Sequence, residues 1–271
     1  MPVDHGAALR QLHRPGDPFI LANAWDLGSA KMLVARGAQA IGTSSAAHAF
    51  TLGLPDGELT RDQALDHAQA LISAVNVPVS GDFENGFGDS PDSVAETVRL
   101  AADIGLAGIS IEDTALPADT PYGFDLAVER IRAGVDAARS LPKDFVFVAR
   151  ADGILRASYD IKEALRRIAA FDQAGADCLY VPMPASVNDL QQVIASTDKP
   201  VNALVAGPYC NMSRATFAQM GVARISLGSS LARVVHRTID DAGRAMFDTG
   251  DFSDLAGGMS GAVVDKILRG N

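Results

Sequence analysis

The strongest constraint on the fold of this chain is an alternation of short apolar runs with longer segments of helical period, repeated eight times. Short runs rich in β-branched and apolar residues predict strands, whereas a 3.6-residue period predicts helices. Such alternation favours an α/β fold with a parallel sheet, and eight units close into a (β/α)8 barrel of the TIM type. The expected strands span residues 19–22, 40–43, 77–82, 108–111, 145–150, 178–181, 201–205 and 223–227.

Helices are expected between these strands, and one further region follows the last strand at the end of the chain. They cover residues 26–36, 60–74, 93–104, 126–139, 159–173 and 213–220, with a long helix beginning near Ser229. Glycines at 257, 258 and 261 then break the helical pattern. Since α/β barrels commonly need about 250 residues, residues 1–271 are expected to form one barrel domain, with 251–271 as a C-terminal helical appendage.

Composition excludes several partners. The formal net charge of −10 argues against nucleic acid, which requires clustered Lys and Arg. The first residues, with Asp4, His5 and Gln11, lack the apolar core of a signal peptide, and no run approaches the roughly 18 apolar residues of a membrane span. A cytoplasmic protein without membrane contact is expected. Cys178 and Cys210 lack metal or disulfide spacing and are expected to be free thiols.

Acidic residues gather where the expected strands end, which is the edge of a barrel that carries chemistry. Asp82 and Glu84 follow the third strand, Glu112 follows the fourth, and Asp56 lies in the loop after the second. Two carboxylates about 4 Å apart repel by roughly 4 kcal/mol at an effective dielectric constant of 20, so this cluster requires a cation or raised pKa values. A divalent cation is the simpler prediction.

The donor set favours magnesium. All-oxygen ligands select a hard cation, and carboxylates that leave room for water and substrate suit Mg²⁺, with Mn²⁺ as an alternative. Zinc is not expected, because the 5 histidines show no paired spacing at a strand end. Arg150, at the end of the fifth strand, adds a cation able to hold a carboxylate or phosphoryl group with two hydrogen bonds.

Other polar residues at the same edge fit two roles each. Asp113 and Asp152 could bind the metal or orient Arg150. Ser44 and Ser45 could offer hydroxyl and N–H groups to an oxyanion, although serines in such turns also cap helices.

Two further reaction classes would require particular residues at the ends of the strands. Glycines at 207 and 228 follow the last two strands, where barrels commonly bind phosphate, so a sugar-phosphate enzyme stays open. A Schiff-base aldolase is not expected, because no lysine stands at the end of a strand.

Five segments together resemble the isocitrate lyase and phosphoenolpyruvate mutase superfamily. They are GTSS at 42–45, LPDG at 54–57, DFENGFG at 82–88, IED at 111–113 and VARAD at 148–152. The resemblance implies a (β/α)8 barrel that holds Mg²⁺, with the last helix swapped onto a neighbouring subunit of a homo-oligomer, a dimer or tetramer. It also implies bond cleavage or formation beside a 2-oxo or 2-hydroxy acid through an enolate.

The resemblance carries roles over to individual residues. It implies that Asp82 binds the metal most directly, while the other carboxylates of the metal set place its waters. The implied metal residues are Asp82, Glu84, Glu112 and Asp56; the implied substrate-binding residues are Ser44, Ser45, Ala46, Asp82 and Arg150; and the implied catalytic residues are Arg150, Glu112 and Asp56.

One loop departs from the family pattern. The isocitrate and methylisocitrate lyases carry K-[KR]-C-G-H after the fourth strand, but residues 115–123 read ALPADTPYG here, without the cysteine. Tyr122 or Asp119 could replace that proton donor, or the loop 113–124 could serve only as a lid.

The leading hypothesis from the sequence is therefore a Mg²⁺-dependent carbon–carbon lyase that cleaves or decarboxylates a small 2-oxo or 2-hydroxy di- or tricarboxylic acid through an enolate. The alternatives are a phosphonopyruvate-type carbon–phosphorus mutase or hydrolase, and a 2-oxo acid binding protein without turnover.

Overall fold

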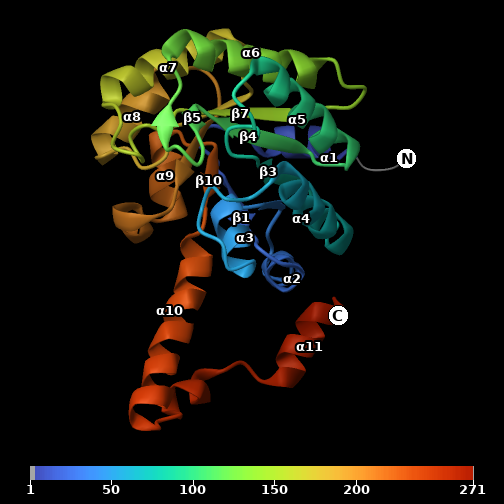
Figure 1. Ribbon diagram of the computed structural model, residues 1–271, viewed down its shortest axis with the longest axis vertical. Helices are drawn as coiled ribbons and strands as arrows, with labels where there is room; N and C mark the ends of the chain where they lie inside the picture. The colour runs from blue at the N-terminus through green and yellow to red at the C-terminus, as the bar shows by residue number, and fades with distance from the viewer. Residues whose placement is uncertain (1–3, 271) are drawn as a thin grey trace.

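The computed structural model describes residues 4–270 and confirms the predicted barrel (Figure 1). Eight parallel strands close in the order β1-β10-β9-β8-β7-β4-β3-β2. Each coincides with a predicted strand to within about two residues at either end. Their bounds are β1 Phe19–Asn23, β2 Ala40–Gly42, β3 Val79–Asp82, β4 Gly108–Glu112, β7 Val146–Arg150, β8 Cys178–Tyr180, β9 Val201–Leu204 and β10 Arg224–Ser226.

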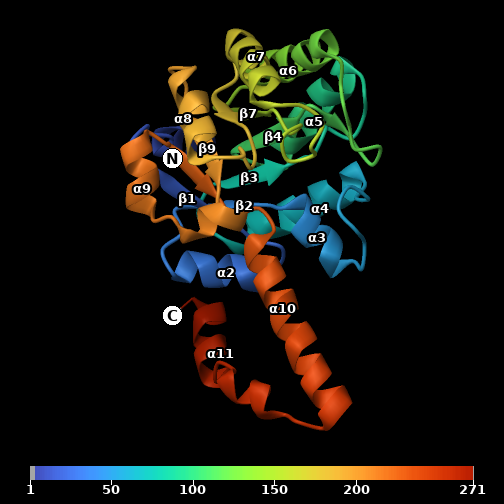
Figure 2. The same ribbon diagram turned by 90° about the vertical axis from the view of Figure 1, so that its left-hand side faces the viewer.

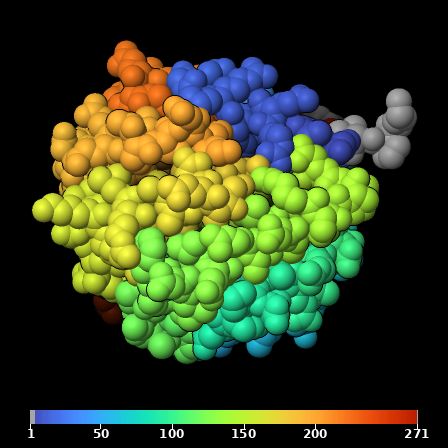
Figure 3. Space-filling model, turned by 90° about the horizontal axis from the view of Figure 1, so that it is seen from above, coloured from blue at the N-terminus to red at the C-terminus, as the bar shows by residue number. Residues whose placement is uncertain are grey.

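Helices connect these strands and form the outer layer of the barrel. In Figure 3 the segments follow one another in chain order from cyan through green and yellow to orange, and a blue segment near the N-terminus lies beside the orange one. Gly175 (φ 97°) and Gly221 (φ 92°) follow α7 and α9 in the left-handed conformation that a glycine adopts at no steric cost. The helices are α1 His5–Leu12, α2 Leu27–Ala35, α3 Ser45–Thr51, α4 Arg61–Ala74, α5 Pro91–Asp103, α6 Phe124–Arg139, α7 Ile161–Gln173, α8 Val187–Ala195, α9 Arg214–Met220, α10 Ser230–Arg244 and α11 Gly261–Arg269.

Successive side chains of each strand point to opposite faces, so one set faces the helices and the other faces the inside of the barrel. Ile109, Ile111 and Phe147 belong to the large apolar cluster that also contains helix residues such as Ile131 and Ile168. The main hydrophobic core therefore lies between the strands and the helices. A smaller cluster, made from the intervening strand residues, fills the lower part of the barrel together with Leu9 of α1.

The chain leaves the barrel after β10. Figures 1 and 2 show α10 projecting away from the barrel and α11 returning beside α2. The Nζ of Lys31 on α2 donates to the carbonyl oxygen of Leu268 at 3.4 Å. A short helix, Ala245–Thr249, follows α10. Within residues 251–270 the chain forms a second short helix, Ser253–Gly257, and α11, so the described part of the expected appendage is helical.

Two further predictions concern the chain as a whole. Cys178 is buried and Cys210 is exposed, and both are free thiols as predicted. Within residues 4–270, no helix combines the length and the apolar character needed to cross a membrane.

Candidate active site

A cavity of about 460 Å³ opens at the carboxyl ends of the barrel strands. Seven of the predicted site residues line it, which means that segments up to about 100 residues apart are brought together there. They are Ser44, Ser45, Ala46, Asp56, Asp82, Glu112 and Arg150.

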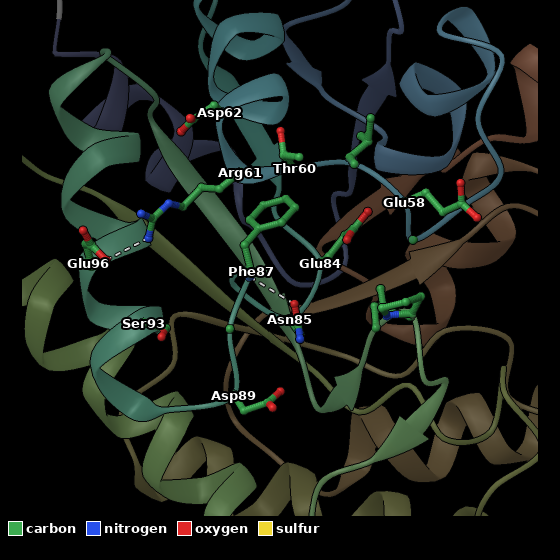
Figure 4. Close-up of a pocket in the computed structure, with 15 residues that line it drawn as sticks. Glu58, Thr60, Arg61, Asp62, Glu84, Asn85, Phe87, Asp89, Ser93 and Glu96 are labelled. Carbon is green, nitrogen blue, oxygen red and sulfur yellow. Dashed lines mark hydrogen bonds and ion pairs between the residues drawn. The ribbon is translucent and has the colours of Figure 1, made fainter.

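Glu84, the remaining predicted metal residue, lines a second and more open cavity of about 960 Å³ beside the first. Figure 4 shows it on the loop that leads from β3 to α5, followed by Asn85, Phe87 and Asp89. Glu84 has φ 48°, a left-handed conformation that costs energy for a non-glycine residue and often marks a functional position. The wall between the two cavities is shared, because Leu116 lines both.

Asp82 lies at the end of β3, where its carboxylate accepts three hydrogen bonds from residues of α3 and β7. The backbone N–H and the hydroxyl of Ser45 each donate to Oδ2 at 3.1 Å, and Arg150 donates to Oδ1 at 2.6 Å. The Asp82 backbone N–H donates in turn to the Thr43 hydroxyl at 2.7 Å. These contacts fix the carboxylate at the centre of the cavity.

Arg150, at the end of β7, connects three carboxylates. Its Nη1 contacts Asp82 at 2.6 Å, and its Nη2 contacts Glu112 at 3.1 Å and Asp152 at 2.7 Å. Asp152 accepts from Nε as well, at 3.0 Å, so this pair is bidentate. Burial opposes the positive charge of Arg150, but the charges of Asp152, Glu112 and Asp82 outweigh burial and raise the pKa of the guanidinium.

Asp113 holds Asp152 in place from outside the cavity. Its Oδ1 accepts from the backbone N–H of Asp152 at 2.8 Å, while its Oδ2 accepts from the Tyr159 hydroxyl at 2.8 Å and from Arg167 at 2.9 Å. Neither Asp113 nor Asp152 lines the central cavity. Of the two roles open from the sequence, the geometry favours orienting Arg150 for both residues.

Glu84, Asp56 and Glu112 have raised pKa values. Burial, reinforced by the charge of Asp82, raises the pKa of Glu84 to about 8 and raises that of Asp56. Burial also raises the pKa of Glu112, together with the charges of Asp152 and Asp82. Such a cluster of carboxylates is the arrangement that a bound cation would stabilise.

The residues present fit a divalent cation, although direct ligands are few. Glu84 and Glu112 each bury one carboxylate oxygen, Oε1, that has no hydrogen-bond partner among residues 4–270. In the same part of the chain, no three His, Cys, Asp or Glu side chains converge closely enough to hold a metal by themselves. One direct carboxylate ligand, with the other acids contacting water, matches this geometry and the preference of Mg²⁺ for retaining water.

The serines after β2 take both of the roles considered. Ser44 caps α3, since its hydroxyl accepts from the Ala47 backbone N–H at 3.3 Å, whereas Ser45 contacts Asp82. On the opposite rim, the Gly228 backbone N–H donates to the Asn23 side chain at 2.9 Å. This amide is already satisfied, which weakens the sugar-phosphate alternative.

The loop after β4 forms a small hairpin of β5 (Thr114–Ala115) and β6 (Thr120–Pro121). The Tyr122 hydroxyl donates to Asp89 at 2.7 Å, accepts from Asn85 and lines neither cavity. Asp119 forms an ion pair with Arg156 at 2.9 Å. Since Tyr122 is engaged away from the cavity, the structure gives no support to it as the proton donor.

Several lining residues were not predicted from the sequence, among them two arginines and a tyrosine. Arg156 lies 3.9 Å from carboxylate oxygens of both Asp56 and Glu112. Tyr180 and Arg224 line the cavity from β8 and β10. Strand alternation could have found the last two, because they share the inward face of their strands.

Comparison with known proteins identifies the family of the chain. The family model described as phosphoenolpyruvate phosphomutase matches residues 9–247. The uncharacterized protein Rv1998c of Mycobacterium tuberculosis is 34% identical over 82% of this chain and 82% of its own length. The 2,3-dimethylmalate lyase of Eubacterium barkeri is 31% identical over 70% of this chain and 68% of its own length.

A solved structure shares the whole fold. The crystal structure of a lyase/mutase candidate from Burkholderia cenocepacia J2315 is 41% identical, covers 97% of this chain and 94% of its own, and superposes with a TM-score of 0.92. The match of the family model to most of the chain is decisive. The chain belongs to the phosphoenolpyruvate mutase/isocitrate lyase superfamily.

Proposed function

We propose that this protein is a Mg²⁺-dependent lyase that cleaves or decarboxylates a carbon–carbon bond in a small 2-oxo or 2-hydroxy acid through an enolate. The observation that carries this proposal is the cluster of Asp82, Glu112 and Arg150 at the cavity mouth, where one buried oxygen of Glu112 has no hydrogen-bond partner among residues 4–270. The kinship with 2,3-dimethylmalate lyase supports carbon–carbon chemistry.

The proposed roles follow from the contacts. Asp82 would bind Mg²⁺ directly, and Asp56, Glu84 and Glu112 would hold its waters. The bound ion would supply positive charge to the enolate. Arg150 would bind the part of the substrate remote from the metal, using donors held in place by Asp152.

The remaining roles concern the substrate carboxylate and the proton. Ser44, Ser45 and Ala46 line the cavity beside Asp82 and would face the substrate carboxylate. Glu112 and Asp56, whose pKa values burial raises, are the proposed groups for holding and moving the proton.

Calorimetry with oxalate, which has the planar, chelating shape of pyruvate enolate, tests the proposal. Oxalate should bind only when Mg²⁺ is present, and Asp82→Asn should abolish this binding. Glu58→Gln is the matched control, because Glu58 is an exposed acid of the neighbouring cavity. Absence of oxalate binding with and without Mg²⁺ would refute the metal–enolate site.

A second experiment separates the competing reactions. The family description, phosphoenolpyruvate phosphomutase, favours carbon–phosphorus chemistry as the second candidate. A panel of 2-oxo and 2-hydroxy acids should give carbon–carbon cleavage products, whereas phosphorus NMR would show phosphate or a rearranged phosphonate from phosphonopyruvate. Tight binding of these acids without any product would instead indicate a binding protein.

We also propose that the C-terminal segment packs on a second copy of the chain. Phe247 is 88% exposed and Phe252 is 63% exposed on the projecting segment, an unusual exposure for large apolar side chains. Light scattering should show a dimer or tetramer for the full chain. A chain ending at residue 244 should be monomeric, and an unchanged mass for that shortened chain would contradict the swap.

A further inference from the structure

The loop from β3 to α5 holds Glu84 in an unusual backbone conformation. Glu84 (φ 48°), Gly86 (φ 83°) and Phe87 (φ 58°) are all left-handed, although only one of the three is a glycine. For a residue with a side chain this conformation costs energy, and it persists only where the surrounding structure holds it. Contacts from other elements are therefore needed to keep the loop in place.

Arg130, on α6, contacts this loop through the loop's backbone. Its Nη1 donates to the carbonyl oxygen of Gly88 at 2.6 Å, and its Nη2 donates to that of Asn85. The side chain is 1% exposed, and its guanidinium carbon lies 4.0 Å from the centre of the Tyr122 ring. Because the guanidinium is a rigid, planar fork, it fixes two carbonyl groups three residues apart, the first of them directly after Glu84.

The charge of Arg130 serves these carbonyl groups. Among residues 4–270, no carboxylate lies within 4.0 Å of its guanidinium, in contrast with those of Arg150 and Arg167. A buried guanidinium is costly unless it is paired and hydrogen bonded, and an apolar side chain of similar volume would avoid that cost. Packing alone therefore does not account for an arginine at this position.

The carboxylate of Glu84 depends on the backbone of this loop for its direction. Its Oε1 is buried and has no hydrogen-bond partner in the described part of the chain. The Glu84 carbonyl oxygen, by contrast, accepts from the Glu112 backbone N–H at 2.9 Å, and the next carbonyl oxygen, that of Asn85, accepts from Arg130. Figure 4 shows Glu84 and Asn85 as neighbours whose side chains point in different directions. A turn of the peptide between them would thus move the Glu84 carboxylate.

We propose that Arg130 is a positioning residue of the metal site, which holds the loop in the left-handed conformation that aims Glu84 at the ion and its waters. This inference rests on the proposed function, because it assumes that Glu84 takes part in metal binding. Arg130 lines neither cavity, so it acts through the backbone of Asn85 and Gly88 rather than by contact with metal or substrate.

Binding of Mn²⁺, followed by the EPR signal of the free ion, tests the proposal without requiring turnover. Arg130→Lys keeps the charge but loses the planar fork, and Arg130→Met loses both. Each should weaken Mn²⁺ binding by about ten- to hundred-fold, the loss typical of residues that orient metal ligands, with the larger loss in Arg130→Met.

A double variant shows whether Arg130 acts through Glu84. Glu84→Gln should itself weaken Mn²⁺ binding. Adding Arg130→Lys to Glu84→Gln should then change the affinity by less than about two-fold, because the carboxylate that Arg130 positions is already absent. A general loss of stability would instead give losses that add.

Two controls separate positioning from destabilisation. Arg139→Lys alters an arginine of the same helix that also donates to a backbone carbonyl, that of Gly175 at 3.0 Å, and should bind Mn²⁺ as the wild type does. Gly6→Ala, in α1, should lower stability and leave Mn²⁺ affinity unchanged.

The outcomes are distinct. Wild-type Mn²⁺ affinity in the folded Arg130 variants or in Glu84→Gln, or additive losses in the double variant, would overturn the role of Arg130. Arg130→Lys and the double variant decide the matter even if Arg130→Met fails to fold. Absence of Mn²⁺ binding by the wild type would refute the proposed metal site, and this inference with it.

Discussion

Replacing Asp113 by Asn tests how firmly Arg150 is held. Asp113 accepts one bond on Oδ1 and two on Oδ2, all between 2.8 and 2.9 Å, and its side chain is fully buried. An asparagine can accept on one side only, so its NH₂ group must face either the Asp152 N–H or the donors from Tyr159 and Arg167. Burial raises the pKa of Asp113, so the charge itself is costly, and the loss arises from partners left unpaired.

Breaking a buried pair in this way costs about 3 kcal/mol. At roughly 2–4 °C per kcal/mol for a chain of this size, the melting temperature should fall by about 6–12 °C. Guanidinium unfolding gives the free energy directly, with an unchanged m-value as the check on two-state behaviour. Tyr159→Phe is the control, because it removes a single hydroxyl bond worth about 1 kcal/mol. An Asp113→Asn variant within 1 kcal/mol of the wild type would refute this reasoning.

Three further predictions concern other parts of the chain. Burial lowers the pKa of His67 to about 4, below its ordinary value of 6.5, so stability should be full above pH 6.5 and fall by about 2–3 kcal/mol toward pH 4.5. His67→Gln should lack this component, and identical pH profiles of unfolding free energy for the two proteins would contradict it. Gly6→Ala places a Cβ 1.7 Å from the Asp144 carbonyl oxygen and should lower the free energy of unfolding by at least about 2 kcal/mol. Gly28→Ala is the control, because its Cβ has its nearest contact at 3.5 Å and the substitution should be neutral or stabilising in thermal melts. Tyr122→Phe should cost about 1 kcal/mol and leave oxalate binding unchanged; loss of Mg²⁺-dependent oxalate affinity would show that the phenol acts in the site after all.

The barrel was predictable because its strands are buried on both faces and separated by helices of regular period. Runs such as Phe145 to Arg150 are nearly continuous in apolar character, which is typical of parallel strands. The short α3 and the hairpin of β5 and β6 escaped prediction. Strands of two residues, such as β5 and β6, show no periodicity, and tertiary contacts such as the Tyr122 N–H donating to the Asp113 carbonyl oxygen hold the hairpin in place.

The candidate site was predictable where residues follow strands and unpredictable where they lie within them. Asp82, Glu112 and Arg150 were found by examining strand ends, and they converge as expected. Arg224 is the first residue of its strand and lines the cavity from inside the barrel, so its position in the sequence does not mark it as a site residue. Arg156 lies six residues beyond Arg150, and only the three-dimensional path of its loop brings it toward Glu112.

The serines inside the barrel are positions where substitutions should be tolerated by the fold. Ser80, Ser110 and Ser226 contribute little to holding the scaffold together, because the large apolar cluster is built from the alternate residues that face the helices. Mutations at these three positions can therefore alter what the barrel accommodates while sparing the scaffold. Adjacent residues along one strand, such as Ile109 and Ser110, thus face different surroundings, the first the apolar cluster and the second the cavity.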